Sequence, residues 1–69
     1  MSHYDIYMKL NVVFTDVYNV TEDWAPIDKN SIRLSLISGE EMIFSYRGVN
    51  NWSLETVDSY FERIGNGNY

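Results

Sequence analysis

The sequence predicts a small α+β protein in which an antiparallel β-sheet of three to four strands is covered on one face by a single C-terminal helix. Residues 4–14 place apolar side chains at every second position, which is typical of a strand with one buried face. Residues 31–47 repeat this alternation on both sides of a glycine turn. Residues 54–64 carry an apolar stripe with the spacing of a helix. We therefore expect the strands first and the helix last.

The length and the composition limit the chain to one domain. A chain of 69 residues has room for one hydrophobic core, so we expect residues 1–69 to form a single domain. The lack of cysteine excludes disulfides and thiolate metal ligands and favours a reducing, cytoplasmic setting. A core of this size contributes only about 3 to 5 kcal/mol to stability, which makes a homodimer a reasonable expectation.

Neither a membrane span nor secretion is indicated. The sequence contains no apolar run of membrane-spanning length, and its first residues lack the basic start and the apolar stretch of a signal peptide. The formal net charge of −5 repels anionic lipid and the phosphate backbone of nucleic acids at long range. We expect a cytoplasmic protein, in the host cytoplasm if a phage encodes it, for which direct nucleic-acid binding is disfavoured.

The opening segment is expected to be the strand on which the sheet is built. Its even-numbered side chains from Tyr4 to Phe14 would point to the interior, and Tyr7 and Lys9 would lie on the outer face. After Phe14 the alternation is interrupted, which predicts a bulge or a bend into another short strand over residues 15–20.

Residues 21–31 are expected to form a long loop, because Pro26 disfavours both a helix and a central strand. Trp24 in this loop has two interpretations. It either plugs one open end of the core or acts as an apolar interface anchor beside the acidic residues Glu22 and Asp23. The residue pattern alone leaves both interpretations open.

The second half of the sheet is predicted to be a β-hairpin. A three-residue loop over residues 38–40 keeps the apolar side chains of both strands on one face, whereas a two-residue loop would mix core and charged residues. Gly39 would supply the positive φ that such a loop requires. Arg33 and Arg47 would then lie on the opposite face, where the outward Lys9 joins them. The side chains of the core face are Ile32, Leu34, Leu36, Met42, Phe44 and Tyr46.

The C-terminal segment is predicted to be a helix that begins after Ser53 and ends at Gly65. Ser53 can accept hydrogen bonds from the free N–H groups of the first turn, and Gly65 suits the left-handed position that ends many helices. Residues 66–69 are expected to fray. The apolar stripe would cover the sheet and consists of Leu54, Val57, Tyr60, Phe61 and Ile64.

No constellation of catalytic residues is recognisable in the sequence. His3 is the only histidine, so it has no second imidazole for a metal pair or a catalytic dyad. The acidic pairs are expected in turns and on exposed helix positions. No cleft is expected there that would give the two acids of a pair different pKa values, which acid–base catalysis requires. Neither a phosphate-binding glycine loop nor a calcium loop is present. We expect a protein that is not an enzyme and that has no catalytic residues, metal site or cofactor.

The leading functional hypothesis is a module that binds another protein with a basic surface. Glu55, Asp58 and Glu62 would form an acidic row on the helix, in which carboxylates stand where the phosphates of DNA would stand. Such a DNA mimic would inhibit or regulate a larger enzyme, for example a nucleic-acid-processing enzyme, in the manner of small phage or mobile-element proteins. The predicted acidic site consists of Glu22, Asp23, Glu40, Glu41, Glu55, Asp58 and Glu62, with Trp24 as the apolar anchor.

Two alternatives remain open. In the first, the chain is a structural subunit that assembles through the outer sheet face, where Val13, Ile37 and Ile43 are expected. In the second, the same face binds single-stranded nucleic acid or a small ligand through one aromatic ring and three cations. The residues of this alternative site are Tyr7, Lys9, Arg33 and Arg47.

Overall fold

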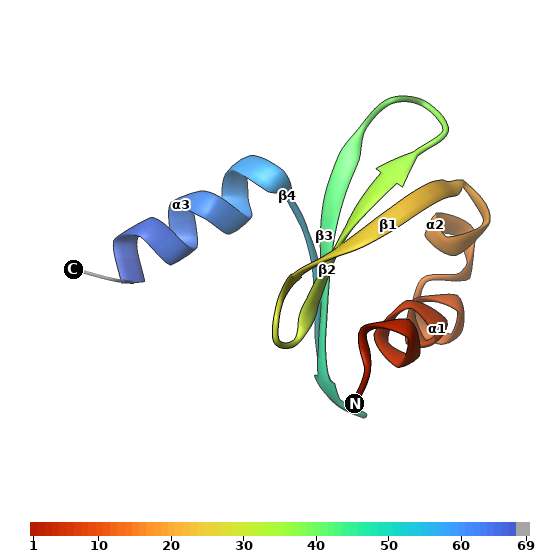
Figure 1. The fold of residues 1–69 in the computed structure, drawn as a ribbon, viewed down its shortest axis with the longest axis horizontal. Coiled ribbons are helices and arrows are strands. Elements are labelled where there is room, and N and C mark those ends of the chain that lie inside the picture. Colours follow the sequence, from red (N-terminus) through yellow and green to blue (C-terminus); the bar gives the residue numbers. More distant parts are fainter. Residues whose placement is uncertain (68–69) are drawn as a thin grey trace.

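The computed structural model describes residues 1–67 and shows a four-stranded antiparallel sheet with two helices before it and one after it (Figure 1). The strand order is β1-β2-β3-β4, so every strand pairs with its neighbour in the sequence. The α+β class, with an antiparallel sheet followed by a C-terminal helix, is confirmed. None of the described helices is long and apolar enough to cross a membrane. In chain order the elements are α1 (His3–Val13), α2 (Thr15–Asn19), β1 (Thr21–Asp28), β2 (Ser31–Leu36), β3 (Glu41–Gly48), β4 (Asn51–Thr56) and α3 (Val57–Gly67).

The prediction of a strand over residues 4–14 is wrong, because this segment forms helix α1. A capping box starts the helix. Ser2 Oγ accepts a hydrogen bond from the Asp5 N–H (3.1 Å), and the Asp5 carboxylate accepts one from the Ser2 N–H (3.2 Å). These two bonds satisfy N–H groups that have no partner within the helix, which stabilises its first turn.

The even-numbered apolar pattern divides into two rows on opposite sides of α1. Residues four apart lie on the same side of a helix, so Ile6 and Leu10 form one row. Tyr4, Met8 and Val12 form the other row. The first row is fully buried, whereas Tyr4 is 60% exposed and Val12 is 73% exposed. A spacing of two residues is therefore also compatible with a helix that has apolar residues on both sides.

The next two segments also differ from the prediction. Residues 15–20 form the short helix α2 and a turn rather than a strand, and residues 21–28 form β1 rather than a loop. Pro26 is tolerated in β1 because β1 is an edge strand. The register between β1 and β2 is irregular at two places, one of which directly follows Pro26.

The predicted β-hairpin and its shared apolar face are confirmed in β2 and β3. The register places Ile32 opposite Phe44. The loop lies at residues 37–39, one residue earlier than predicted, and this moves the pairing by two residues. A shift of two residues leaves every side chain on its original face. Gly39 has the expected positive φ, 96°.

The last helix begins later than predicted. Residues 51–56 form strand β4, which pairs with β3, so Ser53 is not the N-cap. The Thr56 hydroxyl has this role, because it accepts a hydrogen bond from the Ser59 N–H (3.1 Å). Residues 54–56, at the start of the predicted helix, therefore belong to the sheet because they pair with β3.

The later part of α3 extends away from the sheet (Figure 1). The helix continues through Gly67 rather than ending at Gly65. Of the segment 66–69, which was expected to fray, residues 66 and 67 are helical, and residues 68 and 69 lie outside the described residues. Phe61 is 51% exposed and does not cover the sheet as predicted.

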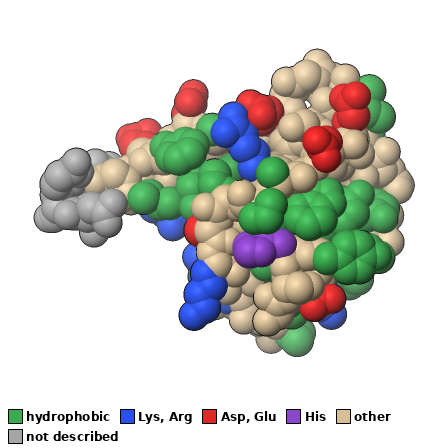
Figure 2. Space-filling view, viewed as in Figure 1, with side chains coloured by type: hydrophobic (Ala, Val, Ile, Leu, Met, Phe, Trp, Pro, Cys, Tyr) green, Lys and Arg blue, Asp and Glu red, His purple; other side chains and the backbone are tan. Residues whose placement is uncertain are grey.

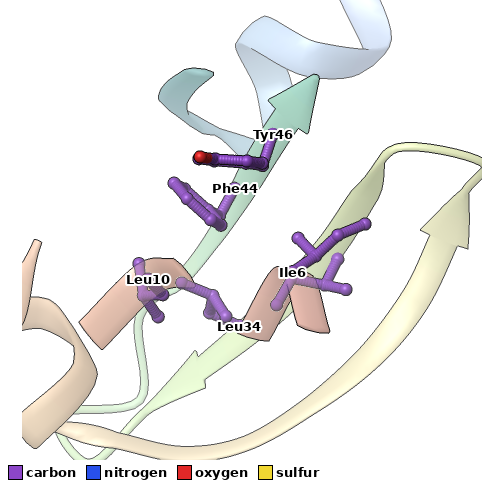
Figure 3. Packing of buried hydrophobic residues seen from close by; sticks show 6 residues of the cluster. Ile6, Leu10, Leu34, Phe44 and Tyr46 are labelled. Carbon is purple, nitrogen blue, oxygen red and sulfur yellow. The ribbon is translucent and has the colours of Figure 1, made fainter. Parts of the chain in front are cut away.

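The hydrophobic core lies between α1 and one face of the sheet (Figure 3). Ile6 and Leu10 of α1 pack against Leu34 of β2 and Phe44 of β3, and all four side chains are fully buried. Phe14 extends this packing, since its ring meets Phe44 edge-on at a centroid distance of 6.1 Å. The helix that covers the core face is therefore α1, which corrects the prediction that the C-terminal helix covers it.

Helix α3 begins against the opposite face of the sheet. Tyr60 of α3 is buried, as are Ile43, Ser31 and Ser45 of that face. The Ser31 and Ser45 hydroxyls are hydrogen-bonded to each other (2.6 Å), so neither is buried without a partner. The two faces of the sheet are thus contacted by two different helices, and α3 covers only part of its face.

Leu10→Ala is expected to lower the free energy of unfolding by about 2 to 5 kcal/mol, because it leaves a cavity between α1 and the sheet. Val12→Ala, on the exposed side of the same helix, is expected to change this free energy by less than about 0.5 kcal/mol. Urea unfolding followed by circular dichroism measures both values. Equal effects of the two substitutions would contradict the packing of α1.

Candidate functional site

The most prominent surface feature is a set of aromatic rings where α1, α2 and β1 meet. The ring of Tyr7 contacts those of Tyr18 and Trp24, with centroid distances of 5.0 Å and 5.3 Å. The planes of Tyr7 and Trp24 differ by 18°, so these two rings are stacked. Hydrophobic side chains gather on this face of the molecule (Figure 2). We call Tyr7, Tyr18 and Trp24 the aromatic seam.

The seam is half-buried, with one side against the core and the other facing solvent. Burial and the neighbouring Tyr18 hydroxyl raise the pKa of Tyr7 above its ordinary value, so its phenol is neutral at physiological pH. Tyr4 precedes Tyr7 by one helical turn and is 60% exposed. The rings therefore form a neutral apolar surface that is held in place from below.

Trp24 has features of both interpretations that the sequence leaves open. It packs against the core cluster, which supports the interpretation as a plug. It is nevertheless only partly buried, and one ring of the seam stacks on it. Its role as an interface anchor stays a prediction, because packing below and exposure above are compatible.

Two acidic residues that form no ion pair within residues 1–67 precede Trp24 in β1. Glu22 and Asp23 directly precede Trp24 and are exposed. The Asp23 carboxylate accepts a hydrogen bond from the backbone N–H of Trp24 (2.9 Å). Asp23 pairs with Ser35 and Trp24 with Leu34, so these two side chains leave β1 on opposite faces. Neither acid forms an ion pair with any residue in the part of the chain that the structure describes. The two acids therefore lie on the same edge strand as Trp24, with Asp23 on the face opposite to the tryptophan ring.

Two ion pairs join described residues, and each uses one of the predicted acidic site residues. Arg33 donates two hydrogen bonds to Glu41, and Arg63 donates two to Glu55, with a shortest distance of 2.7 Å in each pair. The hydrogen bonds from Arg33 lower the pKa of Glu41. The predicted site residues without an ion pair within residues 1–67 are Glu22, Asp23, Glu40, Asp58 and Glu62.

The predicted acidic row on the helix is wrong in one member. Glu55 lies in β4, and only Asp58 and Glu62 lie on α3, four residues apart. Three carboxylates therefore do not follow one helix. The binding role of Asp58 and Glu62 stays a prediction.

The residues of the alternative sheet-face site do not lie together. Tyr7 and Lys9 are on α1, which covers one face, whereas strand alternation places Arg33 and Arg47 on the other face. The Lys9 ammonium stands over the ring of Tyr46, 5.9 Å from its centroid. Arg33 is already ion-paired. The prediction that Lys9 joins the two arginines on one face is therefore wrong.

The outer sheet face is covered in part, and the residues expected to form its apolar assembly surface are not all on it. Ile43 is fully buried on it, and the buried Tyr60 of α3 belongs to the same side. Val13 lies on α1, and Ile37 lies in the β2–β3 loop, 68% exposed. The prediction that Val13, Ile37 and Ile43 share this face is wrong, because the first of them belongs to a helix on the other side.

A second cluster ties α1 and α3 to the turn between β1 and β2. The Tyr60 hydroxyl donates a hydrogen bond to the Asp28 carboxylate, and the Asn30 N–H donates another (2.8 Å). His3 Nε2 donates to the Asp28 carbonyl oxygen (2.6 Å), since a carbonyl can only accept. We call these four residues the Asp28 junction. It holds three segments that are distant in the sequence.

Contacts within the Asp28 junction shift the pKa values of Asp28 and Tyr60. Burial alone would raise the pKa of Asp28, but the hydrogen bonds that it accepts, above all from Tyr60, and the charge of Arg47 lower it. Burial and the hydrogen bond to Asp28 raise the pKa of Tyr60 to about 12. Asp28 is therefore ionised and Tyr60 is neutral near pH 7, as their hydrogen bond requires.

The part of the chain that the structure describes contains neither a pocket nor a group of three residues able to hold a metal ion. Its buried polar side-chain atoms all have hydrogen-bond partners, so the Asp28 junction is a satisfied structural clamp. No protein-family model, curated protein or solved structure matches the chain. The functional interpretation therefore depends on the chemistry of the aromatic seam and its acids.

Tyr18 is not among the site residues that the sequence predicts, and Tyr7 lies on a helix rather than on the expected strand. A signal for the correct placement was present, because Ser2 and Asp5 have capping-box spacing directly before an apolar run. A helix that begins there puts Tyr4 and Tyr7 on one side. Their contact with Tyr18 depends on the packing of separate elements and has no local signal.

Tyr60→Phe is expected to lower the free energy of unfolding by about 1.5 to 3 kcal/mol near pH 7, because it removes a hydrogen bond to a charged carboxylate. The pKa of Asp28 is lowered by folding, so its contribution to stability is lost as the pH falls through that value. The pKa of Tyr60 is raised, so its contribution is lost as the pH rises from about 10 towards 12. The difference in the free energy of unfolding between the wild-type chain and Tyr60→Phe should therefore become smaller at low pH and at high pH.

Urea unfolding over the whole pH range measures this difference, and carboxyl NMR should show a higher Asp28 pKa in the variant. Tyr4→Phe changes the same functional group at an exposed position and is the matched control. A constant stability difference at all pH values would contradict the coupling of Tyr60 to Asp28.

Proposed function

We propose that the chain is a non-catalytic protein-binding module that recognises a basic protein surface with the aromatic seam and with the acids Glu22 and Asp23 of the same edge strand. The observation that carries this proposal is the stacking of Tyr7 on Trp24 at the surface, on an edge strand that also carries two exposed carboxylates without ion pairs among residues 1–67. Aromatic residues that are fixed before binding lose little conformational entropy on binding, and they are common among the residues that dominate interface energies.

The same arrangement favours a cationic side chain as the group that is recognised. An arginine guanidinium or a lysine ammonium is attracted by the face of an aromatic ring, and arginine also stacks on it. Glu22 and Asp23, which are exposed on the same edge strand, would attract further cationic side chains of the partner along this edge. Each of these contacts is stronger for a cation than for a neutral side chain, which supports a basic partner.

The partner that we propose is an enzyme that holds nucleic acid through arginine and lysine residues, with this chain as its inhibitor or regulator. The carboxylates would occupy positions that phosphates occupy in the nucleic-acid complex. The formal net charge of −5 supports long-range attraction to such a surface. Glu40, Asp58 and Glu62 would add to this attraction without contacting the partner at the seam.

A peptide of alternating arginine and glycine is expected to bind at the seam, and the same peptide with citrulline in place of arginine is expected not to bind. The peptide should shift the NMR signals of Tyr7, Tyr18 and Trp24, and its dissociation constant should rise steeply between about 50 and 500 mM salt. Trp24→Leu keeps an apolar side chain over the core and removes the aromatic face, so it should weaken binding about fivefold.

Two double charge reversals distinguish the effect of direct contact on peptide binding from the effect of net charge. Glu22→Lys with Asp23→Lys should abolish peptide binding, whereas Asp58→Lys with Glu62→Lys makes the same change of charge on α3 and should weaken binding only slightly. Equal losses in both variants, or binding that is independent of salt, would contradict the proposal. The proposed enzyme class is tested on proteins that bind the wild-type chain and do not bind the Trp24→Leu variant. An oligonucleotide should displace these proteins from the wild-type chain.

A further inference from the structure

The two edges of the sheet differ in how far they are protected from pairing with another strand. An edge strand has unpaired N–H and C=O groups that can bond to a further strand unless the sequence prevents it. β1 carries Pro26, two register irregularities and the charged residues Glu22 and Asp23. β4 contains neither proline nor lysine, and after its first residue it pairs with β3 without interruption. β4 is therefore the open edge.

Apolar side chains border this open edge. Trp52 is 38% exposed, although its ring meets Phe14 edge-on at a centroid distance of 5.2 Å. Its indole N–H donates to the Val49 carbonyl (3.1 Å), which holds the ring in place. Leu54 lies two residues further along β4, on the same face, and is half-buried. Two fixed apolar residues are thus available at the edge for a further strand.

We infer that β4 pairs in antiparallel orientation with β4 of a second copy of this chain, about a two-fold axis at Ser53. Residues directly opposite in an antiparallel pair share a face, so the axis must pass through a residue rather than between two residues. With the axis at Ser53, Trp52 of each copy lies opposite Leu54 of the other. With the axis at Leu54, Trp52 would instead lie opposite Thr56, and fewer apolar contacts would form.

The local charge permits this pairing although each copy carries a net charge of −5. Glu55 is the only charged residue of β4, and Arg63 neutralises it at 2.7 Å. The edge itself is therefore uncharged, and the repulsion between copies comes from distant groups that salt screens. In a symmetric dimer the contact between Trp52 of one copy and Leu54 of the other forms twice, once on each side of the axis. An unrelated extended peptide does not supply this pair of contacts. The resulting dimer has one continuous sheet of two copies.

Sedimentation equilibrium of the full chain tests the dimer. The wild-type chain should dimerise in a concentration series up to about 0.5 mM, and more tightly at high salt because the repulsion is screened. Ser53→Lys places two like charges opposite each other at the axis and should raise the dimer dissociation constant about fivefold. Ala25→Lys makes the same charge change at an exposed position of β1 and should leave dimerisation unchanged. A monomeric wild-type chain at all these concentrations would overturn the inference.

Cysteine cross-linking tests the register independently of the lysine variant. The chain has no cysteine, so Ser53→Cys introduces a single thiol. Opposite positions in antiparallel strands are about 4.5 to 5.5 Å apart between Cα atoms, which suits a disulfide. Ser53→Cys should form a disulfide dimer under mild oxidation much faster than Ala25→Cys does. Equal rates for the two variants would also overturn the inference.

Discussion

The packing of α1 onto the sheet is the contact on which the other surface features depend. Ile6 and Leu10 set the rotation of the helix, because both are fully buried against β2 and β3. Successive residues of a helix are about 100° apart, so burying Ile6 turns Tyr7 towards the border of the helix, where Trp24 lies. The aromatic seam is therefore a consequence of core packing. A loss of that packing would separate the rings even if all of them were still present.

One face of the sheet is covered by α1, the other is covered in part by the start of α3, and both edges are open. α1 covers one face, and the first part of α3 is held to the other by the Asp28 junction and by the ion pair of Glu55 with Arg63. The remaining surfaces with distinct chemistry are the two edges, where β1 carries acids beside Trp24 and β4 carries Trp52 beside unpaired backbone groups. A small protein can bind through the edges of its sheet, because edge strands supply both side chains and hydrogen bonds.

The hairpin was predictable and the ends of the chain were not, for physical reasons. The alternation in β2 and β3 and the positive φ of Gly39 are local, so they identify the strands and the turn. A period of two in α1 fits a strand and also two rows of a helix, and only the core decides between them. Pro26 suggests a loop unless the strand is known to be an edge. The spacing of Leu54 and Val57 continues across the border of β4 and α3, so the helix start depends on pairing with β3.

The positions of the two edges connect the proposed functions. β1 and β4 lie at opposite ends of the strand order, so a dimer through β4 leaves the aromatic seam of each copy uncovered. Such a dimer presents two seams, and a partner with two basic sites would then bind with avidity, since its second contact is intramolecular. Salt acts in opposite directions on the two interactions, because it screens the attraction to a basic partner and the repulsion between acidic copies. If both proposals hold, low ionic strength would favour the basic partner and high ionic strength would favour the second copy.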